Sequence, residues 1–152
     1  MYLDNAATTP VRREALEAMW PFLTAEFGNP SSHHEVGERA ATALADARAS
    51  VARVVGMRAS DVIFTSGGTE ADNLAIKGIG VAAMLQHGKR HLITTPIEHE
   101  AVLESADYLA RVHGFEVTFL PVDAFGRIDL DAAGAAMRDD TALVSIGYAN
   151  NE

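Results

Sequence analysis

The segment best suited to chemistry is a turn of sequence S-G-G-T at residues 66–69. The apolar run before it, residues 62–65, has the composition and length of a buried strand. After the turn, Thr69 is a candidate hydroxyl cap for a helix that carries apolar residues at helical spacing. Two glycines let the backbone approach an oxyanion closely, and the first N–H groups of a helix point at it. The turn is therefore a candidate phosphate site, and an ordinary strand-to-helix connection is the alternative.

The turn departs from two common phosphate-binding motifs. No Lys follows its second glycine, which excludes G-x-x-x-x-G-K-[ST], and its spacing is not that of G-x-G-x-x-G. The nearest lysine, Lys77, lies about two turns into the helix, and we expect it to point to solvent. Backbone and hydroxyl groups would therefore hold the phosphate, which suits a small cofactor with one phosphate better than a nucleotide triphosphate.

Apolar periodicity and turn residues divide the chain into alternating helices and strands. Helices are expected at residues 11–23, 33–55, 69–86, 99–113 and 129–137, and strands at 62–65, 91–95, 115–122 and 142–148. This alternation predicts an α/β fold with a partial parallel (mixed) sheet and flanking helices. Ligands bind at the carboxyl ends of such strands. Three polar groups follow strand ends: the 66–69 turn, His99 and Asn151.

The helix expected at residues 33–55 begins with two adjacent histidines, His33 and His34. Neighbouring residues on a helix do not face each other, and the sequence places no second pair of ligands near them. We therefore expect no metal site. Ser31 or Ser32, in the loop before this helix, is expected to cap it.

Composition limits the classes of partner. A formal net charge of −9 argues against nucleic acid and anionic membranes. No apolar run approaches the roughly 18 residues of a membrane span, and the first residues lack the features of a signal peptide. The expected location is therefore cytoplasmic. The chain contains no cysteine, which removes disulfides, thiolate metal sites and a cysteine nucleophile from these 152 residues.

Five collinear motifs resemble the cysteine desulfurases of the NifS/IscS type, in the class V aminotransferase group of fold-type I pyridoxal-phosphate enzymes. The motifs are Y-L-D-N-A-A-T-T-P at residues 2–10, F-G-N-P-S-S at 27–32, V-I-F-T-S-G-G-T-E-A-D-N-L-A-I-K-G at 62–78, E-H-E-A-V-L at 98–103 and L-V-S-I-G-Y-A-N-N-E at 143–152. The resemblance implies the first half of the large domain of that fold, with residues 1–32 as an N-terminal arm, helix and loop and residues 33–152 as the first part of the cofactor-binding domain.

The resemblance implies roles for four positions. Gly68 and Thr69 match the pair that binds the phosphate of the cofactor, pyridoxal 5'-phosphate. His99 matches the histidine that stacks over the pyridine ring and takes part in proton transfer. Asn151 matches the asparagine that hydrogen-bonds the ring hydroxyl.

The resemblance also implies groups that these residues lack. In the family, the Asp on the pyridine nitrogen, the Schiff-base Lys in a Ser-x-His-Lys setting and the persulfide-forming Cys all come later in the chain. Lys77 and Lys89 are the only lysines, and neither has that setting. We therefore expect the N-terminal part of a cysteine desulfurase, inactive as a truncated chain.

The full-length family implies L-cysteine as substrate, a homodimer, and a sulfur-acceptor or scaffold protein for iron–sulfur cluster or other sulfur-cofactor assembly. Two alternatives remain open. One is a non-catalytic domain that needs a separate C-terminal half. The other is a different class V enzyme, such as a selenocysteine lyase or an aminotransferase.

Overall fold

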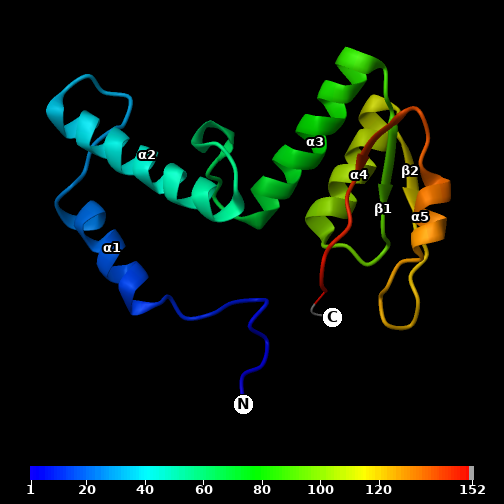
Figure 1. The fold of residues 1–152 in the computed structure, drawn as a ribbon, viewed down its shortest axis with the longest axis horizontal. Coiled ribbons are helices and arrows are strands. Elements are labelled where there is room, and N and C mark those ends of the chain that lie inside the picture. Colours follow the sequence, from blue (N-terminus) through cyan, green and yellow to red (C-terminus); the bar gives the residue numbers. More distant parts are fainter. Residues whose placement is uncertain (151–152) are drawn as a thin grey trace. The chain divides into compact units, whose positions relative to one another are not determined.

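The computed structural model describes residues 1–150 (Figure 1). The chain divides into two compact units at the boundary between Phe64 and Thr65. The helices are α1 (Arg13–Thr24), α2 (Glu35–Val55), η1 (Ala59–Asp61), α3 (Gly68–His87), α4 (Glu100–His113) and α5 (Leu130–Ala136), and the strands are β1 (His91–Thr94), β2 (Glu116–Phe119) and β3 (Thr141–Val144). All five expected α-helices are present, with ends that differ by a few residues at most. The domain boundary expected between residues 32 and 33 stays a prediction.

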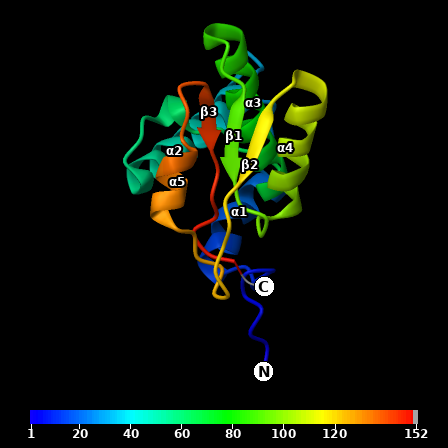
Figure 2. The same cartoon turned by 90° about the vertical axis from the view of Figure 1, so that its right-hand side faces the viewer.

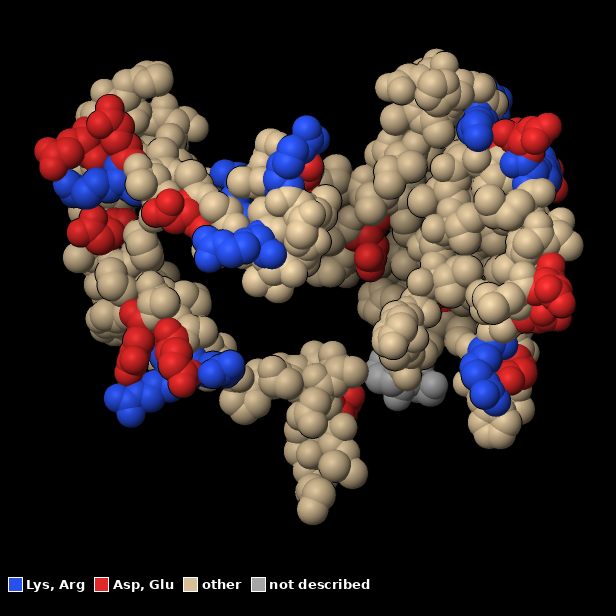
Figure 3. Space-filling model, in the orientation of Figure 1, with Lys and Arg blue, Asp and Glu red and all other residues tan. Residues whose placement is uncertain are grey.

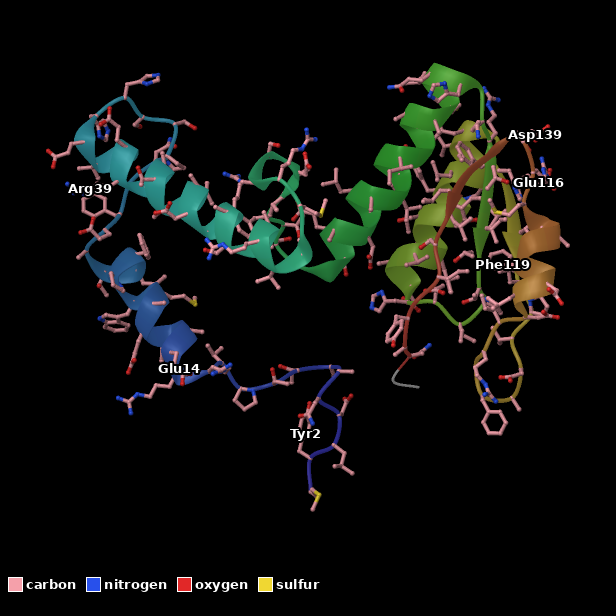
Figure 4. All side chains as sticks on the ribbon, in the orientation of Figure 1. Tyr2, Glu14, Arg39, Glu116, Phe119 and Asp139 are labelled. Atoms are coloured by element: carbon pink, nitrogen blue, oxygen red, sulfur yellow. The ribbon has the colours of Figure 1, made fainter. Side chains whose placement is uncertain are left out.

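The first unit is built on α1 and α2. The imidazole Nδ1 of His34 accepts the N–H of Gly37 at 3.2 Å and so caps α2. The cap expected from Ser31 or Ser32 was therefore wrong, because His34 is the extended residue directly before the helix. Arg39 on α2, labelled in Figure 4, pairs with Glu35 at 2.8 Å and Glu26 at 3.0 Å. Figure 3 shows charges of both signs gathered at this end of α2.

The second unit contains a three-stranded parallel sheet in the order β2–β1–β3. The central strand β1 pairs in register with β2 from His91 and Glu116 to Thr94 and Phe119. Figures 1 and 2 place α5 on the opposite side of the strands from α3 and α4. This follows from right-handed crossovers, because the chain moves from β1 to one neighbour through α4 and then back past β1 through α5.

The strand expected at residues 62–65 was wrong. Val62 has extended backbone angles (φ −89°, ψ 122°), but residues 62–65 pair with no strand in the described part of the chain. A strand exists only as a member of a hydrogen-bonded ladder. Ile63 is 67% exposed, so the apolar composition that predicted a buried strand is not matched by burial here.

The core of the second unit lies between the sheet and the helices α3 and α4. Its buried side chains are Ile76, Leu92, Val102, Ala106, Leu109 and Phe115. They come from α3, from α4, from the fully buried strand β1 and, for Phe115, from the residue directly before β2. This packing holds the N-terminal ends of α3 and α4 in fixed positions relative to the sheet.

Candidate functional site

The glycine-containing turn leads into α3 through a compact set of hydrogen bonds. Gly67 is the N-cap of α3, with extended backbone angles (φ 167°, ψ −178°). Its carbonyl accepts the hydroxyl of Thr65 at 3.0 Å and the N–H of Ala71 at 3.1 Å. The N–H groups of Gly68 and Thr69 precede Ala71 in the first helical turn, where no helical carbonyl can reach them. They are available to an anion.

The carboxylate of Glu70 uses the donors of Ser66. Its Oε2 accepts the backbone N–H of Ser66 at 2.6 Å and the Ser66 hydroxyl at 2.7 Å. These hydrogen bonds, that of the hydroxyl most strongly, hold the pKa of Glu70 below its usual value. Ser66 is therefore satisfied within the turn. The donors left for a phosphate are the N–H groups of Gly68 and Thr69 and the hydroxyl of Thr69.

Thr69 is the second residue of α3, not its N-cap, because the helix already begins at Gly68. The hydroxyl cap expected from Thr69 was therefore wrong, and no side chain caps this helix. A helix whose first N–H groups are uncapped keeps its positive end open to an anionic ligand.

The two glycines of the turn face open space. A Cβ built on Gly67 or on Gly68 meets no atom of the described chain within 4 Å. Internal packing therefore does not require glycine at either position, and the absence of side chains leaves the backbone open to close approach by a ligand. This open space beside the first N–H groups of α3 leaves room for a cofactor phosphate.

The sequence predicted that Lys77 points to solvent, and the structure shows that this was wrong. Its side chain is half-buried, its Nζ donates to Oδ1 of Asn73, and it lies 4.7 Å from the ring centroid of Tyr108. The ammonium is thus held on the helix surface by an amide and a cation–π contact. This arrangement gives Lys77 no part in phosphate binding.

His99 is the N-cap of α4, directly after the loop that leaves β1. Its Nδ1 accepts the N–H of Ala101 at 3.0 Å, and its side chain is exposed. A neutral imidazole that accepts at Nδ1 carries its proton on Nε2. His99 therefore presents an Nε2–H donor at the surface while this cap is intact.

The starts of α3 and α4 lie at the same end of the second unit. In Figure 1 both helices rise from the end toward which the strand arrows point. This is the carboxyl end of the parallel strands, where ligands bind in α/β folds. The structure thus puts the turn that contains Gly68 and Thr69 and the loop that carries His99 at one end of the sheet. Asn151 lies outside the described residues.

Glu98 and Thr95 are residues of this loop to which the sequence alone assigned no role. Glu98 accepts a hydrogen bond from the hydroxyl of Thr95 at 2.7 Å and from the N–H of Gly147, in the segment after β3. The only sequence signal for a role of Glu98 is its position beside His99. Its partner Gly147 is 49 residues away, so local sequence could not predict their contact.

Residues 1–150 contain neither a metal-ligand cluster nor a membrane-spanning helix. No three His, Cys, Asp or Glu side chains in this range come together as possible ligands of a metal ion. In the same range, no helix has both the length and the apolar composition needed to cross a membrane.

The family model for Aminotransferase class-V matches residues 1–152. The chain is 51% identical over 152 residues to Cysteine desulfurase IscS of Dictyoglomus turgidum and 47% identical to Putative cysteine desulfurase IscS 1 of Bacillus subtilis. All of this chain takes part in both matches, but it spans only 38% and 39% of the length of these relatives.

Two solved structures resemble the fold closely. A NifS-like protein has a TM-score of 0.89 and 44% identity, covering 97% of this chain and 40% of its own. SspA, solved in complex with cysteine, has a TM-score of 0.89 and 40% identity, covering 99% of this chain and 43% of its own.

Proposed function

The chain belongs to the class-V aminotransferase family, and from this premise we propose that it forms the cofactor-binding part of a cysteine desulfurase. Such an enzyme removes sulfur from L-cysteine and leaves L-alanine. Relatives with 51% sequence identity to this chain carry the name cysteine desulfurase. The observation that carries the proposal is the open, uncapped start of α3, where Gly68 and Thr69 offer donors to a phosphate.

The cofactor in this proposal is pyridoxal 5'-phosphate. Gly68 and Thr69 bind its phosphate through two backbone N–H groups and one hydroxyl, and the helix dipole of α3 contributes roughly 0.3–1 kcal/mol. By their match to the family motifs, His99 covers the ring and Asn151 hydrogen-bonds its hydroxyl. When bound, the cofactor supplies an electron sink for bond cleavage at the amino acid.

His99 acts in this proposal first as a hydrogen-bond donor. Its Nδ1 is held by the N–H of Ala101, so the neutral ring offers Nε2–H to a ligand. His99 can accept a proton at Nε2 only after Nδ1 releases Ala101 and takes the other tautomer. Proton transfer by His99 therefore requires the cap of α4 to open.

Activity also needs groups outside these 152 residues. A persulfide forms on a thiolate, and the chain has no cysteine. By the same resemblance we propose that the whole protein is a cytoplasmic homodimer that passes sulfur to an acceptor or scaffold protein, for iron–sulfur cluster or other sulfur-cofactor assembly.

A chimera tests the proposed activity. In it, this chain replaces the matched 38% of IscS from Dictyoglomus turgidum, and alanine and sulfide are measured after addition of L-cysteine. We expect turnover within about tenfold of the parent enzyme, a difference of roughly 1.4 kcal/mol in activation free energy. A folded chimera that retains the cofactor but makes no alanine would contradict the proposal. Turnover of selenocysteine without turnover of cysteine would favour a selenocysteine lyase.

The 152-residue chain alone is the matched control. We expect it to release no sulfide from L-cysteine faster than free pyridoxal 5'-phosphate does, because it supplies no thiolate. Faster release by the purified chain would show that its sulfur chemistry does not need the family's cysteine.

A further inference from the structure

The carboxylate of Glu98 joins two segments that follow different strands. Its Oε1 accepts the hydroxyl of Thr95, the residue after β1, at 2.7 Å. Its two oxygens also accept the N–H of Gly147, in the segment after β3, at 2.9 Å and 3.1 Å. One side chain therefore ties the β1–α4 loop to the chain that leaves β3.

The contact between Glu98 and Gly147 is close, and Gly147 itself is exposed. Thr95 is 2% exposed and Glu98 is half-buried. A Cβ built on Gly147 would lie 3.0 Å from Oε2 of Glu98, so a side chain there would press on the carboxylate. Hydrogen bonds to an ionised carboxylate are about twice as strong as neutral ones. One half-buried carboxylate thus accepts all three of these hydrogen bonds.

A second bond runs parallel to this tie. The side-chain amide of Asn150 donates to the carbonyl of Ile97 at 2.6 Å. The β1–α4 loop thus meets the segment after β3 at two successive residues, Ile97 and Glu98.

His99 follows Glu98 directly, and Asn151 follows Asn150 directly. On its other side, His99 is fixed by its own cap on Ala101. We propose that Glu98 is a positioning residue, which sets the place of His99 relative to the segment after β3 that contains Gly147 and Asn150. The inference rests on the proposed function for the roles given to His99 and Asn151, whereas the coupling itself needs no cofactor.

Three substitutions in the 152-residue chain test the coupling. Glu98→Ala removes the carboxylate, Glu98→Gln keeps one acceptor oxygen, and Glu100→Ala removes an exposed carboxylate on the other side of His99 as the matched control. Two readouts are recorded by NMR without cofactor. They are the exchange of the Gly147 amide proton and the ¹⁵N shifts of the His99 ring at pH ~8.5, about two units above the usual pKa of histidine.

We expect Glu98→Ala to speed exchange at Gly147 by roughly tenfold or more and to turn a single Nε2–H tautomer of His99 into a mixture. Glu98→Gln should fall between wild type and Glu98→Ala, and Glu100→Ala should match wild type. A purely structural role for Glu98 would change the melting temperature but leave the tautomer of His99 unchanged. A folded Glu98→Ala chain with a wild-type His99 tautomer would overturn the proposal, whatever the exchange rate at Gly147.

If Glu98→Ala does not fold, Thr95→Val is used in its place. It removes only the hydroxyl that holds the carboxylate, and it should shift both signals in the same direction by a smaller amount. Unchanged signals in Thr95→Val and Glu98→Gln together would overturn the proposal.

Binding of pyridoxal 5'-phosphate separates this inference from the proposed function. A wild-type chain that shows the coupling but binds no cofactor refutes the function and leaves the coupling standing. If wild type and Glu98→Ala bind the cofactor with equal affinity, the positioning role is refuted and the proposed function still stands.

Discussion

A Cβ on Gly80 would lie 2.8 Å from Cδ1 of Leu109. Gly80 is buried in the middle of α3, and Leu109 is a fully buried residue of α4. A Cβ would also lie 3.5 Å from the ring of Phe115. The absence of a side chain at Gly80 therefore allows the close approach of α3 and α4, the two helices whose first turns carry the candidate site.

We expect Gly80→Ala to destabilise the chain and Gly78→Ala to stabilise it. Alanine in a helix gains roughly 0.5–1 kcal/mol over glycine. At Gly78 a Cβ meets nothing within 4 Å, so this gain should appear in full. At Gly80 the clash with Leu109 adds an overpacking cost of about 1–3 kcal/mol. Urea unfolding of both variants measures the difference, and equal stabilisation by both would contradict a close helix contact at Gly80.

His91, at the start of β1, joins all three strands. Its ring nitrogens bond Oγ1 of Thr141 on β3 and Oγ1 of Thr118 on β2, each at 2.8 Å, and its side chain is fully buried. Burial, and to a smaller degree the charge of Arg138, lowers the pKa of His91 from its usual 6.5. Glu116, labelled in Figure 4, pairs with Arg138 at 2.7 Å at this end of the sheet.

We expect stability to fall as the pH drops below 6.5, and His91 to account for part of the fall. Because the folded pKa is depressed, both states are neutral above 6.5 and the stabilisation is complete there. Below 6.5 the unfolded chain binds a proton that the folded chain resists, until the pH passes the folded pKa. Urea midpoints of wild type and His91→Gln between pH 5 and 8 isolate the effect. The pH dependence should be weaker in the variant, and identical slopes would contradict a buried neutral His91.

Strand β3 forms one edge of the described sheet, and apolar side chains on and after it are partly exposed. Val144 is 41% exposed and Ile146 is 38% exposed, and the N–H of Ser145 between them pairs with Ile93. An apolar edge strand is a template for pairing with another chain. We expect the 152-residue chain to self-associate through this edge.

Sedimentation velocity over a range of concentrations measures that association. Ile146→Lys should shift the chain toward monomer, because a charged side chain on an edge opposes pairing. Val112→Lys, at an exposed position on α4, is the matched control and should leave association unchanged. A wild-type chain that sediments as a monomer at every concentration would exclude the edge as an interaction surface.

The sequence predicted the helices well because their signals are local. Gly56, Gly88 and Gly114 each follow a helix in the left-handed conformation, as glycine at a helix C-terminus does. Strand pairing depends on partners that are distant in the sequence. The composition of residues 62–65 therefore could not show whether a neighbouring strand pairs with them. The position of His99 at the start of a helix was likewise local and correctly expected.

The contacts that the sequence could not predict are those that depend on side-chain competition. Glu70 takes both donors of Ser66, and His34 caps α2 in place of a serine. Both involve groups with several possible partners within one turn of chain. Glu98 and Gly147 are far apart in sequence, so only the parallel sheet brings them together.

The central claim is that the start of α3 binds the phosphate of pyridoxal 5'-phosphate. Titration of the 152-residue chain with pyridoxal 5'-phosphate tests it most directly, with Gly68→Val and the matched Gly78→Val in the same helix. A Cβ at either position meets no atom of the described chain within 4 Å, so Gly78→Val controls for the effect of a β-branched side chain on the helix itself. We predict that Gly68→Val weakens binding by about tenfold or more, roughly 1.4 kcal/mol, while Gly78→Val binds as wild type does. Equal affinity of all three chains would contradict the claim.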